Sequence, residues 1–134
     1  MGYPKLKLCV LDGNYAVCRL SCKGHIPEWA AKESLVSITR SKKELTIVCD
    51  KKLVPDDYEK NEDWRCIKIV GSFELDAVGV IASVSVPLAE KEISIYVVST
   101  FDTDYFLVPA KELGEATLAL KDFGHEFLDS KEMS

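Results

Sequence analysis

The chain has 134 residues, of which 17 are basic and 22 acidic, so its net charge is −5. Hydrophobic residues make up 47% and charged residues 29%, which is typical of one globular domain or two very small ones and excludes a disordered chain. The acidic balance argues against nucleic acid and anionic membranes as partners, because both require a surplus of lysine and arginine on the contact surface.

Other parts of the composition indicate a cytoplasmic protein without a metal or a cofactor. No apolar run approaches the roughly 18 to 20 residues that cross a bilayer, and the first residues lack the layout of a signal peptide. The five cysteines, an odd number without a Cys-x-x-Cys pair, are expected to be reduced and mostly buried. Cys18 and Cys22 have a spacing that suits zinc, but only His25 lies nearby, so no metal site is predicted.

Apolar alternation near the start of the chain favours strands. Residues 5–11 and 15–20 are apolar runs on either side of Asp12-Gly13-Asn14, and this turn sequence predicts a β-hairpin between them. Residues 26–31, with Pro27 suited to the first helical position, predict one or two turns of helix.

A second pair of strands is predicted over residues 35–39 and 45–49, on either side of the polar turn 40–44. A charged stretch over residues 50–63 follows this pair. Because it has no apolar periodicity, we interpret it as a linker.

The second half of the chain begins with a strand and a helix. Residues 64–70 predict a strand that stops at Gly71, and residues 75–90 have helical spacing. Pro87 is expected to kink this helix or to restart its last turn, because proline removes a backbone donor. The apolar stripe of the helix contains Ala77, Ile81, Val84 and Leu88.

Two strands, a second helix and an edge strand complete the pattern. Residues 93–98 and 105–108 predict the two strands. Pro109 opens the second helix, and Gly124 is suited to cap its C-terminal end. Residues 125–128 predict a final edge strand, so the order is β-α-β-β-α-β, that of a split βαβ unit.

The two halves of the chain contain an internal repeat. Residues 34–48 align without a gap on residues 94–108, at an offset of 60, and residues 18–20 align on 67–69 at an offset of 49. The difference falls in the first helix, which is shorter in the N-terminal copy. We interpret the chain as two related units of which the first is degenerate; the alternative is that any two β-hairpins align this well.

Several segments resemble the tandem ACT-domain proteins of the aspartokinase-like type, from about residue 5 to residue 128. The most specific segment is the run Ser99-Thr-Phe-Asp-Thr-Asp-Tyr105, and the others are residues 37–40, 44–48, 64–66, 79–83 and 87–90. The resemblance implies an α+β fold of two ferredoxin-like ACT units, residues 1–60 and 61–134, that share an antiparallel sheet with helices on one face. It also implies a regulatory module that binds an amino acid or similar metabolite between its units, and a homodimer.

The residues themselves are suited to an amino acid. The turn 71–74, which leads into the predicted helix, offers backbone N–H groups for a carboxylate. Asp76 and Asp104 can accept from an ammonium or guanidinium group, and Gly79 allows close approach to the backbone. Each residue also has a structural explanation, because Asp76 suits a helix N-terminus, Asp104 suits a turn and Gly79 suits tight packing.

The ligand contacts of an arginine-binding member of this family, carried over residue by residue, define the predicted site. One departure weakens arginine as the ligand, because the acidic residue expected between Asp76 and Val78 is Ala77 here. Two of the contacts close the pocket from the N-terminal unit. The predicted ligand-binding residues are Asp76, Val78, Gly79, Thr100, Phe101 and Asp104, together with Ser37 and Ile38.

Three alternatives come from other classes of function. Catalysis is not expected, because the loop before the first predicted helix is acidic and would repel a phosphate, and because His25 and His125 read as surface or edge residues rather than bases. RNA binding would require basic and aromatic residues on strand 93–98. The main alternative is a protein-interaction or dimerisation module that binds no ligand and acts in trans on a metabolic enzyme, through sheet edges near Lys5 and His125.

Overall fold

The computed structural model describes residues 2–32, 34–72 and 78–129 of the chain. The chain divides into two compact units: unit 1 contains residues 1–12 and 65–134, and unit 2 contains residues 13–64. The boundary at residue 64 lies close to the predicted division at residue 60. Residues 1–12, however, pack in unit 1 rather than with the residues that follow them.

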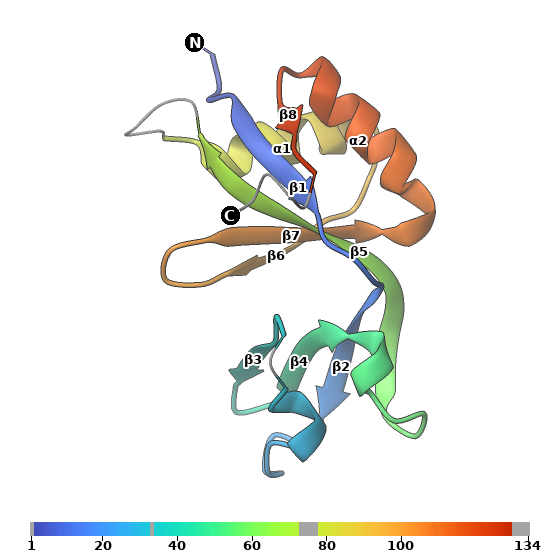
Figure 1. Ribbon diagram of the computed structural model, residues 1–134. Helices are drawn as coiled ribbons and strands as arrows, with labels where there is room; N and C mark the ends of the chain where they lie inside the picture. Colours follow the sequence, from blue (N-terminus) through green and yellow to red (C-terminus); the bar gives the residue numbers. More distant parts are fainter. Residues whose placement is uncertain (1, 33, 73–77, 130–134) are drawn as a thin grey trace. The chain divides into compact units, whose positions relative to one another are not determined.

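Unit 1 contains the predicted β-α-β-β-α-β order, with one additional strand inserted into its sheet (Figure 1). The inserted strand β1 (Leu6–Val10) pairs antiparallel with β5 and parallel with β8. Because β7 pairs with β5 and β6, the strand order of this unit is β6-β7-β5-β1-β8. The other elements are β5 (Glu59–Ser72), α1 (Val80–Glu90), β6 (Tyr96–Ser99), β7 (Asp104–Pro109), the short 3₁₀ helix η3 (Ala110–Glu112), α2 (Leu113–Asp122) and β8 (Glu126–Phe127).

Two predictions about β1 are wrong. The Asp-Gly sequence does not form a hairpin, since β1 pairs with β5 and β8 while the next strand pairs elsewhere. Gly13 has φ 86°, and a Cβ there would lie 2.8 Å from Oδ2 of Asp50, so glycine is required for a backbone conformation that turns the chain into unit 2. The sheet is also not wholly antiparallel, because β1 and β8 run parallel.

The core of unit 1 lies between its sheet and its two helices. Strand β1 buries Leu6, Leu8 and Cys9, and β7 buries the three consecutive residues Phe106, Leu107 and Val108. Val84 and Leu88, from the predicted apolar stripe, are buried on α1. The fully buried side chains of this core are Leu6, Leu8, Ile67, Val84, Leu88, Phe106, Val108, Ala116 and Leu120.

Helix α1 begins later than predicted. The expected start at Leu75 lies within residues 73–77, outside the described residues, but Val78 and Gly79 are described and are not helical. Gly79 is the N-cap and has φ 82°, in the left-handed region that a right-handed helix cannot pass through. Pro87 lies inside the helix.

Both helices of unit 1 end in a Schellman motif. At the end of α1, Ile93 N–H donates to the carbonyl of Leu88 at 2.9 Å, and Glu92 N–H donates to the carbonyl of Ala89 at 3.0 Å. The motif requires a left-handed residue at the position of Glu92, which has φ 57°.

The end of α2 has the same pair of hydrogen bonds, with glycine at the left-handed position. His125 N–H donates to the carbonyl of Leu120 at 3.1 Å, and Gly124 N–H donates to the carbonyl of Lys121 at 2.9 Å. Gly124 has φ 110°, so the predicted glycine cap is confirmed.

Unit 2 is a small sheet with a core of its own. Its strand order is β3-β4-β2-β5, and all these pairs are antiparallel. The predicted strands and the predicted short helix are present, with Pro27 as the N-cap of that helix. The elements are β2 (Tyr15–Leu20), the 3₁₀ helix η1 (Glu28–Ala30), β3 (Ser37–Arg40), β4 (Leu45–Asp50), the 3₁₀ helix η2 (Lys51–Leu53) and the first residues of β5. The core is formed by Ala16, Cys18, Ala30, Ile47, Cys49 and Val54.

The linker prediction for residues 50–63 is wrong from residue 59 onward. β5 begins at Glu59, which pairs with Arg19 of β2. The first residues of β5 form an edge of the described sheet of unit 2, so they are charged and do not alternate with apolar residues.

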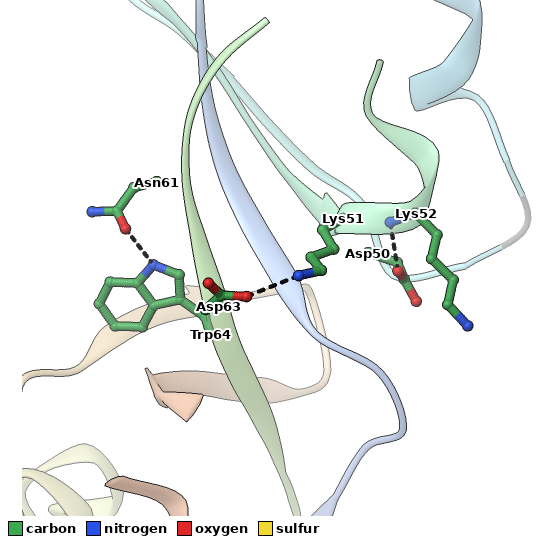
Figure 2. A network of polar contacts seen from close by, with 6 residues as sticks. All are labelled: Asp50, Lys51, Lys52, Asn61, Asp63 and Trp64. Carbon is green, nitrogen blue, oxygen red and sulfur yellow. Dashed lines mark hydrogen bonds and ion pairs between the residues drawn. The ribbon is translucent and has the colours of Figure 1, made fainter. Parts of the chain in front are cut away.

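A β-bulge follows in β5, and Figure 2 shows the polar contacts around it. One extra residue lies between Asn61 and Trp64, and Asp63 has φ 74°. The Asp63 carboxylate accepts from Nζ of Lys51 at 2.9 Å, and Nε1 of Trp64 donates to Oδ1 of Asn61 at 3.2 Å. Both contacts are exposed; the first is made by the left-handed residue of the bulge itself, and the second joins residues on either side of it.

Candidate ligand-binding site

The turn between β6 and β7 positions three of the predicted ligand residues, Thr100, Phe101 and Asp104. Thr100 closes the turn, because its N–H donates to the carbonyl of Thr103 at 2.8 Å and its Oγ1 accepts from the N–H of Thr103 at 3.2 Å. Ser99 and Asp104 are the last pair of the ladder, and the Ser99 hydroxyl donates to Oδ1 of Asp104 at 2.6 Å. The turn therefore fixes the Asp104 carboxylate next to it.

The Asp104 carboxylate retains capacity to accept. A carboxylate has two oxygens and about four lone-pair directions, of which the Ser99 hydroxyl uses one. Asp104 is partly exposed, so an ammonium group can reach it. At the tip of the turn, the Phe101 side chain is 102% exposed and contributes nothing to the core of the described chain.

The start of α1 positions Val78 and Gly79. The first backbone N–H groups of a helix lack acceptors within the helix, and Gly79 has no side chain that could cap them. Such a helix end attracts an anionic group such as a carboxylate. Val78 is 87% exposed next to these donors.

The structure brings some of the predicted residues to one end of unit 1. β5 ends, and β7 begins, at the same end of this sheet, so the start of α1 and the β6–β7 turn share that end (Figure 1). Asp76 lies outside the described residues. Ser37 and Ile38 belong to β3 in unit 2, where they pair with Val48 and Ile47 of β4 and Ile38 is exposed.

The structure contains one buried polar residue that the sequence interpretation placed at the surface. His125 is 4% exposed, so the prediction of a surface or edge residue is wrong. Its Nδ1 accepts from the backbone N–H of Leu6 at 3.1 Å, and its Nε2 lies 2.8 Å from the carbonyl oxygen of Ser83. Burial lowers the pKa of the imidazole, and the positive charge of Lys5 adds to this effect.

One sequence signal could have identified this role of His125. Pro87 has no N–H, so the carbonyl four residues earlier, that of Ser83, loses its helical donor. A buried carbonyl without its helical donor requires a donor from elsewhere, and the His125 imidazole is that donor.

A shallow cavity of about 270 Å³ lies between the two helices of unit 1, away from these residues. It is lined by Pro87, Glu90 and Lys91 of the last turn of α1 and by Ala119, Asp122 and Phe123 of α2. None of the predicted ligand-binding residues lines it. Among the described residues, no group of three or more histidine, cysteine or acidic side chains could hold a metal ion, and no helix is long and apolar enough to cross a membrane.

Comparison with known families identifies the architecture. Residues 59–122, which run from the start of β5 to the end of α2, match the family model described as an ACT domain. Residues 59–122 therefore form an ACT domain. A second family model, described as an N-terminal domain, matches residues 13–57 of this ACT-domain protein, a segment that lies within unit 2. The predicted α+β class with a ferredoxin-like ACT architecture is thereby confirmed.

Three relatives illustrate how far the similarity extends. The ACT-domain protein is 43% identical over 54 residues to the mouse cytosolic arginine sensor for mTORC1 subunit 1, a match to 40% of this chain and 16% of the sensor. A protein of Agobacterium tumefaciens with a crystal structure is 41% identical, with a TM-score of 0.89 and 95% coverage of both chains. The regulatory subunit of aspartate kinase from Thermus thermophilus, at 12% identity, a TM-score of 0.59 and coverage of 87% of this chain and 96% of that one, shares the fold.

The matched segments span less than a fifth of the length of the curated sensor relatives. The resemblance to aspartokinase-like ACT proteins, first seen in residues such as 99–105, is confirmed by these comparisons.

Proposed function

We propose that this ACT-domain protein is a regulatory module, not an enzyme, that binds an amino acid or a similar small metabolite. One observation supports this proposal above the others: the start of α1, where Gly79 has no side chain to cap the helix, and the β6–β7 turn, which holds the Asp104 carboxylate, share one end of unit 1. The first can bind a carboxylate and the second an ammonium group, which are the two charged groups of a free amino acid.

Two exposed apolar side chains suit the remaining part of such a ligand. Phe101 and Val78 are almost wholly exposed, although neither contributes to the core of unit 1. A bound metabolite would give both side chains an apolar contact. The resemblance also assigns Asp76, Thr100, Ser37 and Ile38 to the ligand, and this assignment stays a prediction.

The names of the relatives support a regulatory role and a cytoplasmic location. One relative is described as a cytosolic arginine sensor and another as the regulatory subunit of aspartate kinase. No nucleic acid is expected as a partner, because the net charge of −5 disfavours it.

A thermal-shift screen against the twenty amino acids tests the proposal. A ligand at 100 times its Kd stabilises the folded chain by about 2.7 kcal/mol, which is readily measured. We expect at least one amino acid at millimolar concentration to raise the melting temperature. If none of the twenty does so, the amino-acid proposal is wrong.

A matched pair of variants then locates the site. Asp104→Asn retains an oxygen for the Ser99 hydroxyl but loses the charge that holds the ammonium, so it should abolish the thermal shift without changing the melting temperature of the free protein. Asp102→Asn removes an equivalent charge from an exposed position of the same turn and should bind normally. Equal loss in both variants would point to the net charge rather than to the site.

A second candidate function, self-association without a ligand, is favoured by strand β6. β6 pairs with β7 at an edge of the described sheet, contains no charged residue, and exposes 38% of Val97. Edge strands without charges can pair with another copy of themselves. We therefore propose a homodimer through β6, which Val97→Lys should convert to a monomer in light-scattering measurements. A dimer that persists in this variant would exclude this edge.

A further inference from the structure

The bonds of His125 define the protonation state of its ring. A backbone N–H can only donate, so Nδ1 must accept from Leu6 without a proton of its own. A carbonyl oxygen can only accept, so Nε2 must carry the proton that it shares with Ser83. Neutral imidazole has one donor and one acceptor and satisfies both partners. The imidazolium ion has two donors, and its Nδ1–H would face the N–H of Leu6.

The two partners of His125 belong to elements that lead to the candidate ligand site. Ser83 lies in the first turn of α1, where its own N–H donates to the carbonyl of Gly79 at 2.9 Å. Leu6 pairs with Ser72, the last residue of β5. Both bonds are thus made next to the segment that connects β5 to the start of α1.

Ring contacts reinforce this arrangement. The Phe123 ring lies 5.8 Å from the His125 ring and 5.7 Å from the Tyr3 ring, measured between centroids. Tyr3 also lies close to Gly79, because a Cβ added to Gly79 would lie 3.9 Å from Tyr3 Cδ1. The chain before β1, the end of α2 and the start of α1 therefore meet around His125.

We propose that His125 is a proton-sensitive latch that fastens the start of α1 to β1, at the end of unit 1 where the candidate ligand site lies. That protonation of His125 opens the latch follows from its hydrogen bonds to Leu6 and Ser83 alone. Its effect on ligand affinity rests on the proposed function.

The charged groups around the imidazole all disfavour its protonation or stand apart from it. Lys5, before β1, donates to the carbonyl of Phe123 at 3.0 Å, and its positive charge opposes a second charge on His125. On α1 the contacting group is the neutral Ser83 carbonyl. The remaining charged groups nearby are Lys121, which lies over the Phe127 ring, and the exposed Asp122 and Glu126. The Ser83 carbonyl favours the protonated ring, but burial has the larger effect, and in the described part of the chain no carboxylate bonds to either ring nitrogen.

The direction of the pH effect follows from these contacts. Because burial lowers the pKa of folded His125 below that of an exposed histidine, the unfolded chain binds the proton more tightly than the folded chain does. The contribution of the latch to stability is complete above about pH 6.5, the ordinary histidine value, and is lost as the pH falls toward the lowered pKa. A ligand that requires the closed latch should bind about tenfold more weakly for each pH unit below that pKa, and by reciprocity should lower that pKa further.

The first experiment uses the unmodified chain and no ligand. Nitrogen chemical shifts of the imidazole should show the Nε2–H tautomer at neutral pH and a titration midpoint below 6.5. Amide exchange, corrected for the intrinsic rate, should show that Leu6 loses about tenfold of its protection one pH unit below that midpoint. Ile47, buried in β4 of unit 2, should keep its protection. An Nδ1–H tautomer, or protection of Leu6 that does not change, would overturn the latch.

The second experiment uses a matched pair of variants. The chain has two histidines, and His25 is exposed, so His25→Gln should leave the pH dependence of the urea midpoint unchanged. His125→Gln should remove the loss of stability that begins as the pH falls below about 6.5. The same dependence in both variants would contradict the assignment to His125.

The effect on the ligand site is measured separately. L-Arginine, together with the amino acid that gives the largest thermal shift, is titrated into the unmodified chain and into His25→Gln at about pH 7.5 and about one pH unit below the measured titration midpoint of His125. Weaker binding at low pH supports the coupling, and equal binding at both pH values overturns it. If no amino acid binds at any pH, the proposed function fails, while the tautomer and the exchange of Leu6 still decide the latch.

Discussion

Replacing Glu92 by glycine should stabilise the protein. Glu92 occupies the left-handed position of the Schellman motif that ends α1, with φ 57°. A left-handed conformation costs an L-residue about 1–2 kcal/mol, and glycine avoids this cost. Glycine also increases the entropy of the unfolded chain, and this offsets about 0.4–1 kcal/mol of the stabilisation gained from the relieved strain. The difference predicts a net gain of about 0.5–1 kcal/mol in the free energy of unfolding for Glu92→Gly.

Urea denaturation of the full chain measures this gain. An unchanged dependence of the unfolding free energy on urea concentration checks that unfolding stays two-state. Glu92→Ala is the control for charge, because it removes a carboxylate near the negative end of a helix but keeps the strained backbone; its gain should be about 0.3 kcal/mol. Gly124→Ala is the reverse experiment at the equivalent position of α2. A Cβ at this position would lie 2.6 Å from Nζ of Lys5, and the alanine would have to adopt φ 110°. This variant should therefore lose stability.

A Glu92→Gly variant that is no more stable than Glu92→Ala would contradict backbone strain at position 92. That result would mean that the strain at position 92 has been relieved by its surroundings, and that the benefit, if any, comes from removing the charge.

Three further outcomes are expected. Leu88→Ala should lower the free energy of unfolding by about 2–5 kcal/mol in urea titrations, because Leu88 is fully buried in the core of unit 1. Lys51→Ala should shift the urea midpoint little, and less still at high salt, because the ion pair with Asp63 is exposed. A thiol reagent followed by mass spectrometry should modify the partly exposed Cys22 first, whereas Cys66, whose pKa burial raises to about 12, should react after unfolding.

Local patterns in the sequence predicted most of the secondary structure. The strands β2, β4 and β7 and the helix α2 lie close to their predicted positions, because each is a short run of buried apolar residues bounded by polar or turn residues. The hairpin prediction failed for the opposite reason. An Asp-Gly turn is a local preference, and β1 instead gains its partners from β5 and β8, which are distant in sequence.

The start of β5 shows a second limit of local patterns. The first residues of β5, from Glu59 to Asp63, end the strand order of unit 2 and are mostly exposed, so no hydrophobic alternation is required there. The composition of these residues therefore predicted a linker, whereas backbone pairing with β2 makes them a strand.

The candidate site was predictable where its geometry is local. The Ser99–Asp104 turn is held by bonds among neighbouring residues, so its sequence specifies its shape. His125 was not predictable in this way, because its burial depends on Leu6 and Ser83, which come from two other parts of the chain. The sequence shows that Pro87 lacks an N–H donor, but no local pattern indicates which residue supplies a donor to the Ser83 carbonyl instead.

The insertion of β1 between β5 and β8 determines the order in which the chain can fold during synthesis. Unit 2 is one continuous segment and can complete its sheet once the first residues of β5 have left the ribosome. β1 is synthesised before unit 2, but its partner strands are synthesised after unit 2. Leu6 can pair only once Ser72 has been made, and Lys7 only once Glu126 has been made. The earliest strand of the chain is therefore among the last to be paired, and until then its apolar face is available to molecular chaperones.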